Sequence, residues 1–196
     1  TTFGLLYSKM LAKKGKVLYL NLEPFSGLAE RLGFREDGNL SDVLYYIKER
    51  KETVFHYIQT WVENHDGLYI LPPVLVQSDI GALEEEDWNW FFSELVGKSD
   101  YDVIVVELSN SMRDMQVGFQ ECSKLLVPSL RDYSSAVKIE ELKKYLEKTG
   151  QQKCLSVMEI LYLPKVNAWG NEEELWSCMN EEYTEYLTAL VEKEQE

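Results

Sequence analysis

Residues 1–24 read TTFGLLYSKMLAKKGKVLYLNLEP and predict a helix, a turn and a buried strand, in that order. Apolar side chains within residues 3–11 recur every three or four positions, which is the spacing of one helix face. Gly15 follows a lysine-rich turn, so we expect it to end the helix in the left-handed conformation. Residues 17–20 are apolar and polar residues follow them, which is typical of a strand covered on both faces.

The two threonines that open the sequence permit two interpretations. Thr1 and Thr2 are what remains when a phosphate-binding loop of the pattern G-x-x-x-x-G-K-[ST] is cut just after its lysine. They are also typical N-caps, whose side-chain oxygens accept hydrogen bonds from the first turn of a helix. Because the sequence opens without a methionine, we expect a chain that is truncated at its N-terminus.

The composition predicts one globular domain. With 196 residues, of which 45% are hydrophobic and 12% aromatic, the chain is long enough for a single sizeable core. No apolar run approaches the roughly 20 residues that span a bilayer, and no signal peptide is visible, so we expect no membrane anchor. Cys122, Cys154 and Cys178 show no C-x-x-C pair and no nearby histidine, which argues against a metal site or a disulfide framework. A reducing cytoplasm is the expected compartment.

The net charge of −14 is spread unevenly along the chain. Residues 1–51 contain nine basic and six acidic side chains, whereas the rest contains eleven basic and twenty-eight acidic ones. Duplex binding needs a cluster of cations. The sequence shows no such cluster after residue 51, so direct DNA binding is not expected. Residues 171–196 hold nine acids and one cation, Lys193, which argues against a basic membrane-binding helix.

Beyond residue 24, apolar strands alternate with amphipathic helices. Strands are predicted at 67–73, 101–107, 124–127 and 155–163, and helices near 43–49, 55–62, 88–95, 135–148 and 172–194. The strand at 101–107 is apolar and ends in Glu107, as is usual for a central parallel strand facing a ligand crevice. Pro128 is expected to break the following strand. The alternation predicts an α/β fold, a mainly parallel sheet flanked by helices on both faces.

Some side chains in these segments have specific expected positions. His56 and His65 lack a cysteine or a second histidine at ligand spacing, so we expect them on the surface or in packing roles. The helix at 135–148 is expected to turn four side chains inward, namely Val137, Leu142, Tyr145 and Leu146.

Three segments, in this order, resemble one protein family. The opening TTFGLLYSKMLAKKGKVLYLNLEP resembles the segment that follows the loop lysine in MinD/ParA-type deviant Walker ATPases. YDVIVVELSNS resembles their Walker B strand, and KLLVPSLRDYSSAVKIEELKKYL resembles the strand, loop and helix after it. The acidic, aromatic middle is most similar to the pilus-assembly CpaE branch. The resemblance covers residues 1 to about 150, and it implies a single three-layer P-loop NTPase-like domain over 1–196, truncated within the phosphate-binding motif.

The resemblance implies a role for each of five polar residues near ATP and Mg²⁺. Thr1 would coordinate Mg²⁺ through its hydroxyl, and Thr2 would meet the α-phosphate. Glu107 stands where Walker B has an Asp that holds Mg²⁺, although it also fits a structural role at a strand end. Glu23 matches the carboxylate that positions the attacking water, and Asn21 replaces an Asp beside the metal. These replacements put fast hydrolysis in question.

Two loops complete the implied site. Pro164, Lys165 and Asn167 match the later loop that holds adenine in the family, although the segment between residues 153 and 164 is shorter than the family's. Asn110 and Ser111 match the loop that senses the γ-phosphate, without the family's usual prolines or glycines.

Two functions follow from these features. The first is a cytoplasmic MinD/ParA-like ATPase that hydrolyses Mg-ATP slowly and dimerises with nucleotide, to control the localisation or assembly of a protein partner. The second is a regulatory or interaction module that keeps the fold while its altered carboxylates have lost turnover. The partner itself cannot be read from the residues.

Overall fold

The computed structural model of the chain describes residues 1–35, 37–109, 118 and 122–193. Its strands are β1 Val17–Asn21, β2 Glu63–His65, β3 Leu68–Ile70, β4 Val103–Glu107, β5 Leu125–Ser129 and β6 Met158–Tyr162. Its helices are α1 Thr2–Ala12, α2 Leu28–Leu32, α3 Leu40–Lys48, α4 Val54–Trp61, α5 Gln77–Gly81, α6 Glu85–Lys98, α8 Tyr133–Lys148, α9 Gln152–Ser156, α10 Glu172–Ser177 and α11 Glu181–Glu192. The predicted alternation of strands and helices is confirmed.

Four strands form the main sheet in the order β2-β3-β1-β4. β1 pairs in parallel with β3 on one side and with β4 on the other, where Asn21 lies opposite Glu107. β2 pairs antiparallel with β3 around Asp66 and Gly67, which both have positive φ, as a two-residue hairpin requires. β5 and β6 form a second, parallel pair. The sheet is therefore mainly parallel, as predicted.

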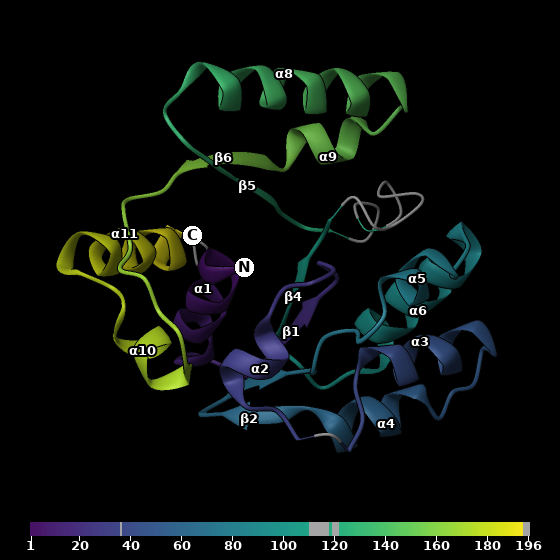
Figure 1. The fold of residues 1–196 in the computed structure, drawn as a ribbon. Helices are drawn as coiled ribbons and strands as arrows, with labels where there is room; N and C mark the ends of the chain where they lie inside the picture. Colours follow the sequence, from purple (N-terminus) through teal and green to yellow (C-terminus); the bar gives the residue numbers. More distant parts are fainter. Residues whose placement is uncertain (36, 110–117, 119–121, 194–196) are drawn as a thin grey trace.

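Helices cover both faces of the main sheet, as Figure 1 shows. Helices α1, α10 and α11 pack on the face that contains Val17 and Tyr19. Helices α3 to α6 pack on the opposite face, against Leu18 and Leu20. Helices α8 and α9 cover β5 and β6, with Leu146 buried between them. Because successive residues of a strand point to opposite faces, β1 contributes to both helical layers, and the architecture is α/β/α.

β4 lies at the edge of the main sheet, which differs from the central position expected for it. All five of its residues are half-buried. The reason is that β1 covers one edge of β4, while no strand among the described residues pairs with the other edge.

The expectation for Gly15 is wrong. Helix α1 ends at Ala12, and Gly15 is not among the glycines with positive φ. A Cβ at Gly15 would lie 2.6 Å from Asp102 Oδ2. That carboxylate accepts a hydrogen bond from the Lys16 backbone nitrogen at 2.7 Å. A side chain at this position would have to displace Asp102, which approaches the turn closely.

Three details of the C-terminal half also differ from expectation. Pro128 lies inside β5, opposite Leu161, and a proline fits there because no described strand pairs with the other edge of β5. The strand predicted at 155–163 begins later, at Met158, because residues 152–156 form α9. In α8, Val137 and Tyr145 are exposed rather than inward, because a helix that covers only two strands buries a narrow face.

The histidines occupy the predicted kinds of position. His56 is exposed on α4, whereas His65 is largely buried, with its Nδ1 atom 2.6 Å from Glu172 Oε1 on α10. Among the described residues, the structure has no helix that is both long and apolar enough to cross a membrane.

Candidate functional site

The candidate site lies where β1 and β4 end, beside the start of α1. Asn21 and Glu107 are the last residues of these two strands, and Glu23 follows β1 after one residue. The Leu22 backbone nitrogen donates to the Glu107 carbonyl at 2.9 Å, so the segment after β1 stays hydrogen-bonded to the end of β4. Parallel strands therefore bring the predicted carboxylates to one edge of the sheet.

Thr1 lies between the two carboxylates. Its hydroxyl donates a hydrogen bond to Glu23 Oε2, and the terminal amino group of the sequence forms an ion pair with Glu107 Oε1 at 2.5 Å. The Thr1 side chain makes no capping hydrogen bond to α1. The hydroxyl is therefore directed at the acidic groups and does not act as an N-cap.

A buried hydrogen-bond chain supports the inner side of the site. Tyr19 Oη donates to Glu107 Oε2 and accepts a hydrogen bond from Asn21 Nδ2 at 3.3 Å. Asn21 Oδ1 in turn accepts from the Glu23 backbone nitrogen at 2.7 Å. Tyr19 and Asn21 are both 0% exposed. Burial, together with the negative charge of Glu107, raises the pKa of Tyr19 well above its ordinary value, so the phenol keeps its proton and remains a donor.

Gly4 allows α1 to approach this chain of hydrogen bonds closely. A Cβ at Gly4 would lie 3.1 Å from Glu107 Oε2 and 3.1 Å from Tyr19 Cε2. A side chain here would press on both groups at once. The helix start is therefore held against the ends of β1 and β4 without an intervening side chain.

Thr2 contacts the loop that follows β6. Trp169 Nε1 donates to Thr2 Oγ1 at 2.9 Å. The Arg31 guanidinium lies 3.3 Å from the Trp169 ring centroid and donates to the Trp169 carbonyl oxygen. Trp169 is 7% exposed. These contacts join α1, α2 and the loop after β6 beside the site.

The residues that were predicted from this loop are Pro164, Lys165 and Asn167, and the hydrogen bonds of the last two lead to another part of the chain. Pro164 is half-buried, and Lys165 and Asn167 are exposed. Backbone atoms of Lys165 and Asn167 bond to the segment between α10 and α11. Within the described residues, no hydrogen bond joins these three residues to Thr1 or to either carboxylate. Trp169 is the residue of this loop that reaches the site.

The predicted γ-phosphate loop begins just after β4. Asn110 and Ser111 lie outside the described residues. Ser109, which precedes them, donates from its hydroxyl to the Leu22 carbonyl at 2.8 Å, so the second residue after β4 is bonded to the residue that follows β1.

Two residues of the site, Tyr19 and Trp169, are not predicted from the sequence. Tyr19 lies two positions before Asn21 in β1, so the two-residue period of a strand could have placed its hydroxyl on the same face. Trp169 is 167 positions from Thr2, and no local pattern predicts their contact.

The oxygen atoms of the Thr1, Glu23 and Glu107 side chains suit Mg²⁺ as a few of its ligands, with phosphate oxygens and water as the rest. The Thr1 hydroxyl and the carboxylates of Glu23 and Glu107 offer oxygen atoms, which Mg²⁺ prefers. No described group of three or more His, Cys, Asp or Glu side chains could hold a metal ion. A Mg²⁺ ion here would take most of its ligands from phosphate oxygens and water, as is usual in nucleotide sites.

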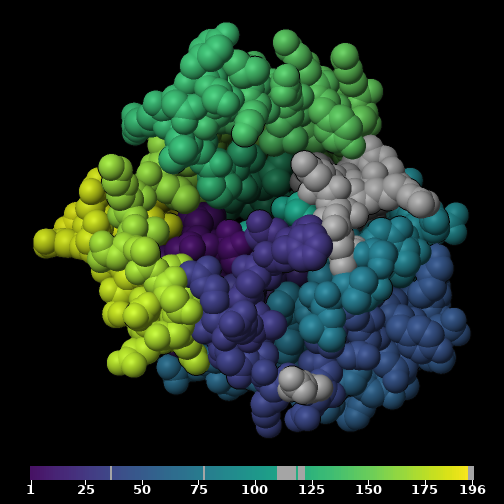
Figure 2. All heavy atoms as spheres, in the orientation of Figure 1, coloured from purple at the N-terminus to yellow at the C-terminus, as the bar shows by residue number. Residues whose placement is uncertain are grey.

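The surroundings also suit a phosphate group. Helix α1 has no acidic residue in its first turn, so its positive end and unpaired backbone N–H groups face the site without an opposing charge on the helix. In the space-filling view, the surface is hollowed between the N-terminal segment, in purple, and the α8–α9 segment, in green (Figure 2).

No protein-family model and no curated protein matches the sequence. Several solved structures match the fold. A ParA family ATPase from Chlorobium tepidum has a TM-score of 0.64 and 19% identity over 83% of this chain and 67% of its own. A plasmid partition protein from Borrelia burgdorferi has a TM-score of 0.65 and 15% identity, over 97% of this chain and 90% of its own. MinD from Pyrococcus horikoshii, complexed with Mg-ADP, has a TM-score of 0.58 and 17% identity, over 91% of this chain and 71% of its own.

At these identities the similarity shows the fold. The chain has the fold of the ParA/MinD P-loop NTPases, a mostly parallel sheet flanked by helices. It spans about two thirds of the length of the Chlorobium protein.

Proposed function

We propose that the protein is a cytoplasmic ParA/MinD-like ATPase of the CpaE type that binds Mg-ATP at Thr1, Glu23 and Glu107 and hydrolyses it slowly. The observation that supports this most is the hydrogen bond from the Thr1 hydroxyl to Glu23, at the sheet edge where β1 and β4 end. The shared fold with ATPases and with a Mg-ADP complex adds support.

Each residue has a separate task in this function. The Thr1 hydroxyl and the Glu107 carboxylate bind the cation, which neutralises phosphate charge, and Glu23 orients the attacking water. The Asn21 side chain supports Glu23 by accepting a hydrogen bond from the Glu23 backbone nitrogen. Thr2 accepts a hydrogen bond from Trp169, so its own O–H proton stays available to a phosphate oxygen.

The adenine contacts are assigned to the loop after β6, with Pro164, Lys165 and Asn167 beside the base. A glycine-rich loop ending in Gly-Lys is expected immediately before Thr1 in the full-length protein, because phosphate binding needs backbone N–H groups and a cation there. A full-length sequence without such a loop would refute nucleotide binding at this site.

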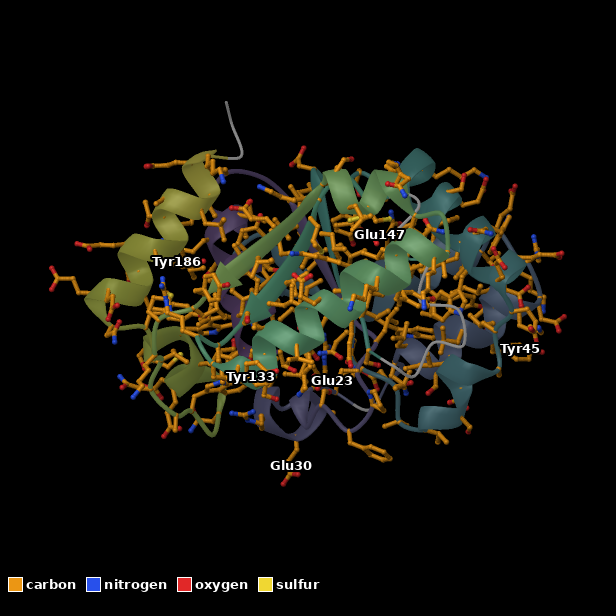
Figure 3. The ribbon with its side chains drawn as sticks, turned by 90° about the horizontal axis from the view of Figure 1, so that it is seen from above. Glu23, Glu30, Tyr45, Tyr133, Glu147 and Tyr186 are labelled. Atoms are coloured by element: carbon orange, nitrogen blue, oxygen red, sulfur yellow. The ribbon has the colours of Figure 1, made fainter. Side chains whose placement is uncertain are left out.

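Phosphate release by the full-length protein with Mg-ATP tests the catalytic role of Glu23. Glu23→Gln is expected to lower the rate at least tenfold while ATP binding persists, because the amide cannot orient water as the carboxylate does. Glu30→Gln is the matched control, since Glu30 on α2 is exposed and points away from the molecule in Figure 3. A Glu23→Gln variant as active as the wild type would refute this role.

A module that binds nucleotide without hydrolysing it is the second candidate. It is favoured by the hydrogen bonds that already engage both carboxylates, from Thr1 to Glu23 and from Tyr19 to Glu107. ATP binding without phosphate release, in both the wild type and the Glu23→Gln variant, would support this candidate over the first.

Nucleotide-dependent homodimerisation is part of the first proposal. Phe25 is 86% exposed only two residues after Glu23, so a large apolar side chain lies at the surface next to the site. Analytical ultracentrifugation of the Glu23→Gln variant is expected to show dimers with Mg-ATP and monomers with EDTA. Monomers under both conditions would contradict it.

Neither DNA nor anionic lipid is proposed as a direct ligand, because the chain beyond residue 51 is strongly acidic. Fluorescence anisotropy with a DNA duplex and co-sedimentation with anionic vesicles are both expected to show no binding at moderate salt. Clear binding in either assay would overturn the corresponding part of the proposal.

A further inference from the structure

We propose that Tyr19 is a positioning residue for Glu107, which it holds by one carboxylate oxygen so that the other faces Thr1 and the Mg²⁺ site. This inference rests on the proposed function. It assigns to a buried strand residue the task of aiming a metal-binding carboxylate.

The two oxygens of Glu107 have different neighbours. Oε2 accepts a hydrogen bond from the Tyr19 hydroxyl and lies 3.5 Å from Asn21 Nδ2, on the buried side. Oε1 lies on the side of the helix start, 2.5 Å from the terminal amino group of Thr1. The tyrosine therefore occupies the inner oxygen and leaves the outer one directed at the site.

The sheet register makes this contact possible. Tyr19 lies opposite Val105 and Asn21 lies opposite Glu107 in the parallel pairing of β1 with β4. Residues two apart in a strand point to the same face, so the phenol extends along that face toward the end of β4. Tyr19 is 0% exposed, and its ring is therefore fixed by the surrounding core.

A glutamate at this position needs such a partner more than an aspartate would. Its additional methylene adds a rotatable bond, and an unrestrained glutamate side chain samples several rotamers. A residue that hydrogen-bonds to a metal-binding side chain orients it, and the loss of such a residue typically lowers metal affinity 10–100-fold. The hydroxyl of Tyr19 supplies this restraint from the interior, where water cannot compete.

Gly4 provides a second, independent way to disturb the same contact. A Cβ at this position would lie 3.1 Å from Glu107 Oε2 and 3.3 Å from Tyr19 Oη. Gly4→Ala therefore pushes on the hydrogen bond from the side of α1 while the tyrosine hydroxyl stays in place.

The test is a Mg²⁺ titration of the binding of a fluorescent ATP analogue to the full-length protein. Tyr19→Phe is expected to raise the Mg²⁺ concentration at half-maximal binding about tenfold and to leave the affinity measured in EDTA unchanged. Tyr183→Phe is the matched control, because it removes the same atom from another buried tyrosine of the same apolar cluster. It should leave the midpoint unchanged.

A second measurement separates positioning from a general loss of structure. In a Glu107→Gln background, Tyr19→Phe is expected to cause no further shift of the Mg²⁺ midpoint, because the carboxylate that it aims is already gone. If Tyr19→Phe does not fold, Gly4→Ala is expected to shift the midpoint in the same direction.

The outcomes distinguish the inference from the function on which it rests. Mg²⁺-dependent binding by the wild type with an unchanged midpoint in the variants refutes the positioning role alone. Equal weakening with and without Mg²⁺ also refutes it, since that is the effect of a structural defect. No binding of the analogue by the wild type refutes the proposed function, and the inference with it.

Discussion

Replacement of Asp87 with asparagine is expected to destabilise the protein by about 2 kcal/mol at neutral pH. Asp87 lies in the first turn of α6 and is 6% exposed. It accepts hydrogen bonds from Lys48 Nζ at 2.8 Å, from the Glu84 backbone nitrogen at 3.0 Å and from Arg50 at 3.4 Å. One carboxylate therefore joins the α3 end to the start of α6.

The magnitude follows from the contacts that asparagine cannot make. A hydrogen bond to a charged group contributes about 1.5–3 kcal/mol, and a helix cap about 1 kcal/mol. Asparagine keeps the shape and one acceptor, so part of the cap survives. The Lys48 and Arg50 side chains are 46% and 42% exposed, so water can solvate them after the change. About 2 kcal/mol corresponds to a fall in Tm of roughly 4–8 °C for a domain of this size.

The loss should depend on pH. Burial alone would raise the pKa of Asp87, but the hydrogen bonds from Lys48 and the Glu84 backbone, and the nearby positive charges, lower it below the ordinary value of 3.8. A group whose pKa is lower in the folded state stabilises the fold above its unfolded pKa. That stabilisation disappears as the pH falls through the lowered folded value. The difference between wild type and variant should therefore be complete at pH 7 and shrink below pH 3.8.

Urea unfolding curves of Asp87→Asn and Glu86→Gln provide the measurement and its control. Glu86 is the adjacent residue, its side chain is 90% exposed, and it lies 3.9 Å from Arg50. Removing its charge should change the free energy of unfolding by less than about 0.5 kcal/mol. Equal losses in the two variants, or a pH-independent loss for Asp87→Asn, would refute the reasoning.

Three further predictions concern packing near and away from the site. Gly15→Ala should lower the free energy of urea unfolding by about 1–3 kcal/mol, because its Cβ would lie 2.6 Å from Asp102 Oδ2. Gly97→Ala in α6 should raise it by about 0.5–1 kcal/mol, since nothing lies within 4 Å of that Cβ and alanine favours the helix; a loss there would contradict this. Trp169→Phe should lower Tm, because the variant loses the hydrogen bond to Thr2, which contributes about 1 kcal/mol. An unchanged Tm would show that this bond contributes nothing.

Local patterns predicted most of the elements, because helix and strand periodicity depend on residues close together in the chain. They failed where a distant group decided the outcome. Gly15 was assigned to a helix end, but Asp102, from before β4, is what excludes a side chain there. β2 was overlooked although the Asp66-Gly67 pair is a typical hairpin turn, because its three residues are too short to show alternation.

The sequence by itself determined the order of strands and helices and the acidic groups at the strand ends, since apolar periodicity and chain order suffice for both. Only the tertiary structure decided that Thr1 lies between Glu23 and Glu107, and that Tyr19 and Trp169 support them from the sheet and from a loop near the other end of the chain. These contacts join residues up to 167 positions apart. They depend on the register of β1 with β4 and on how closely α1 packs, which no local pattern encodes.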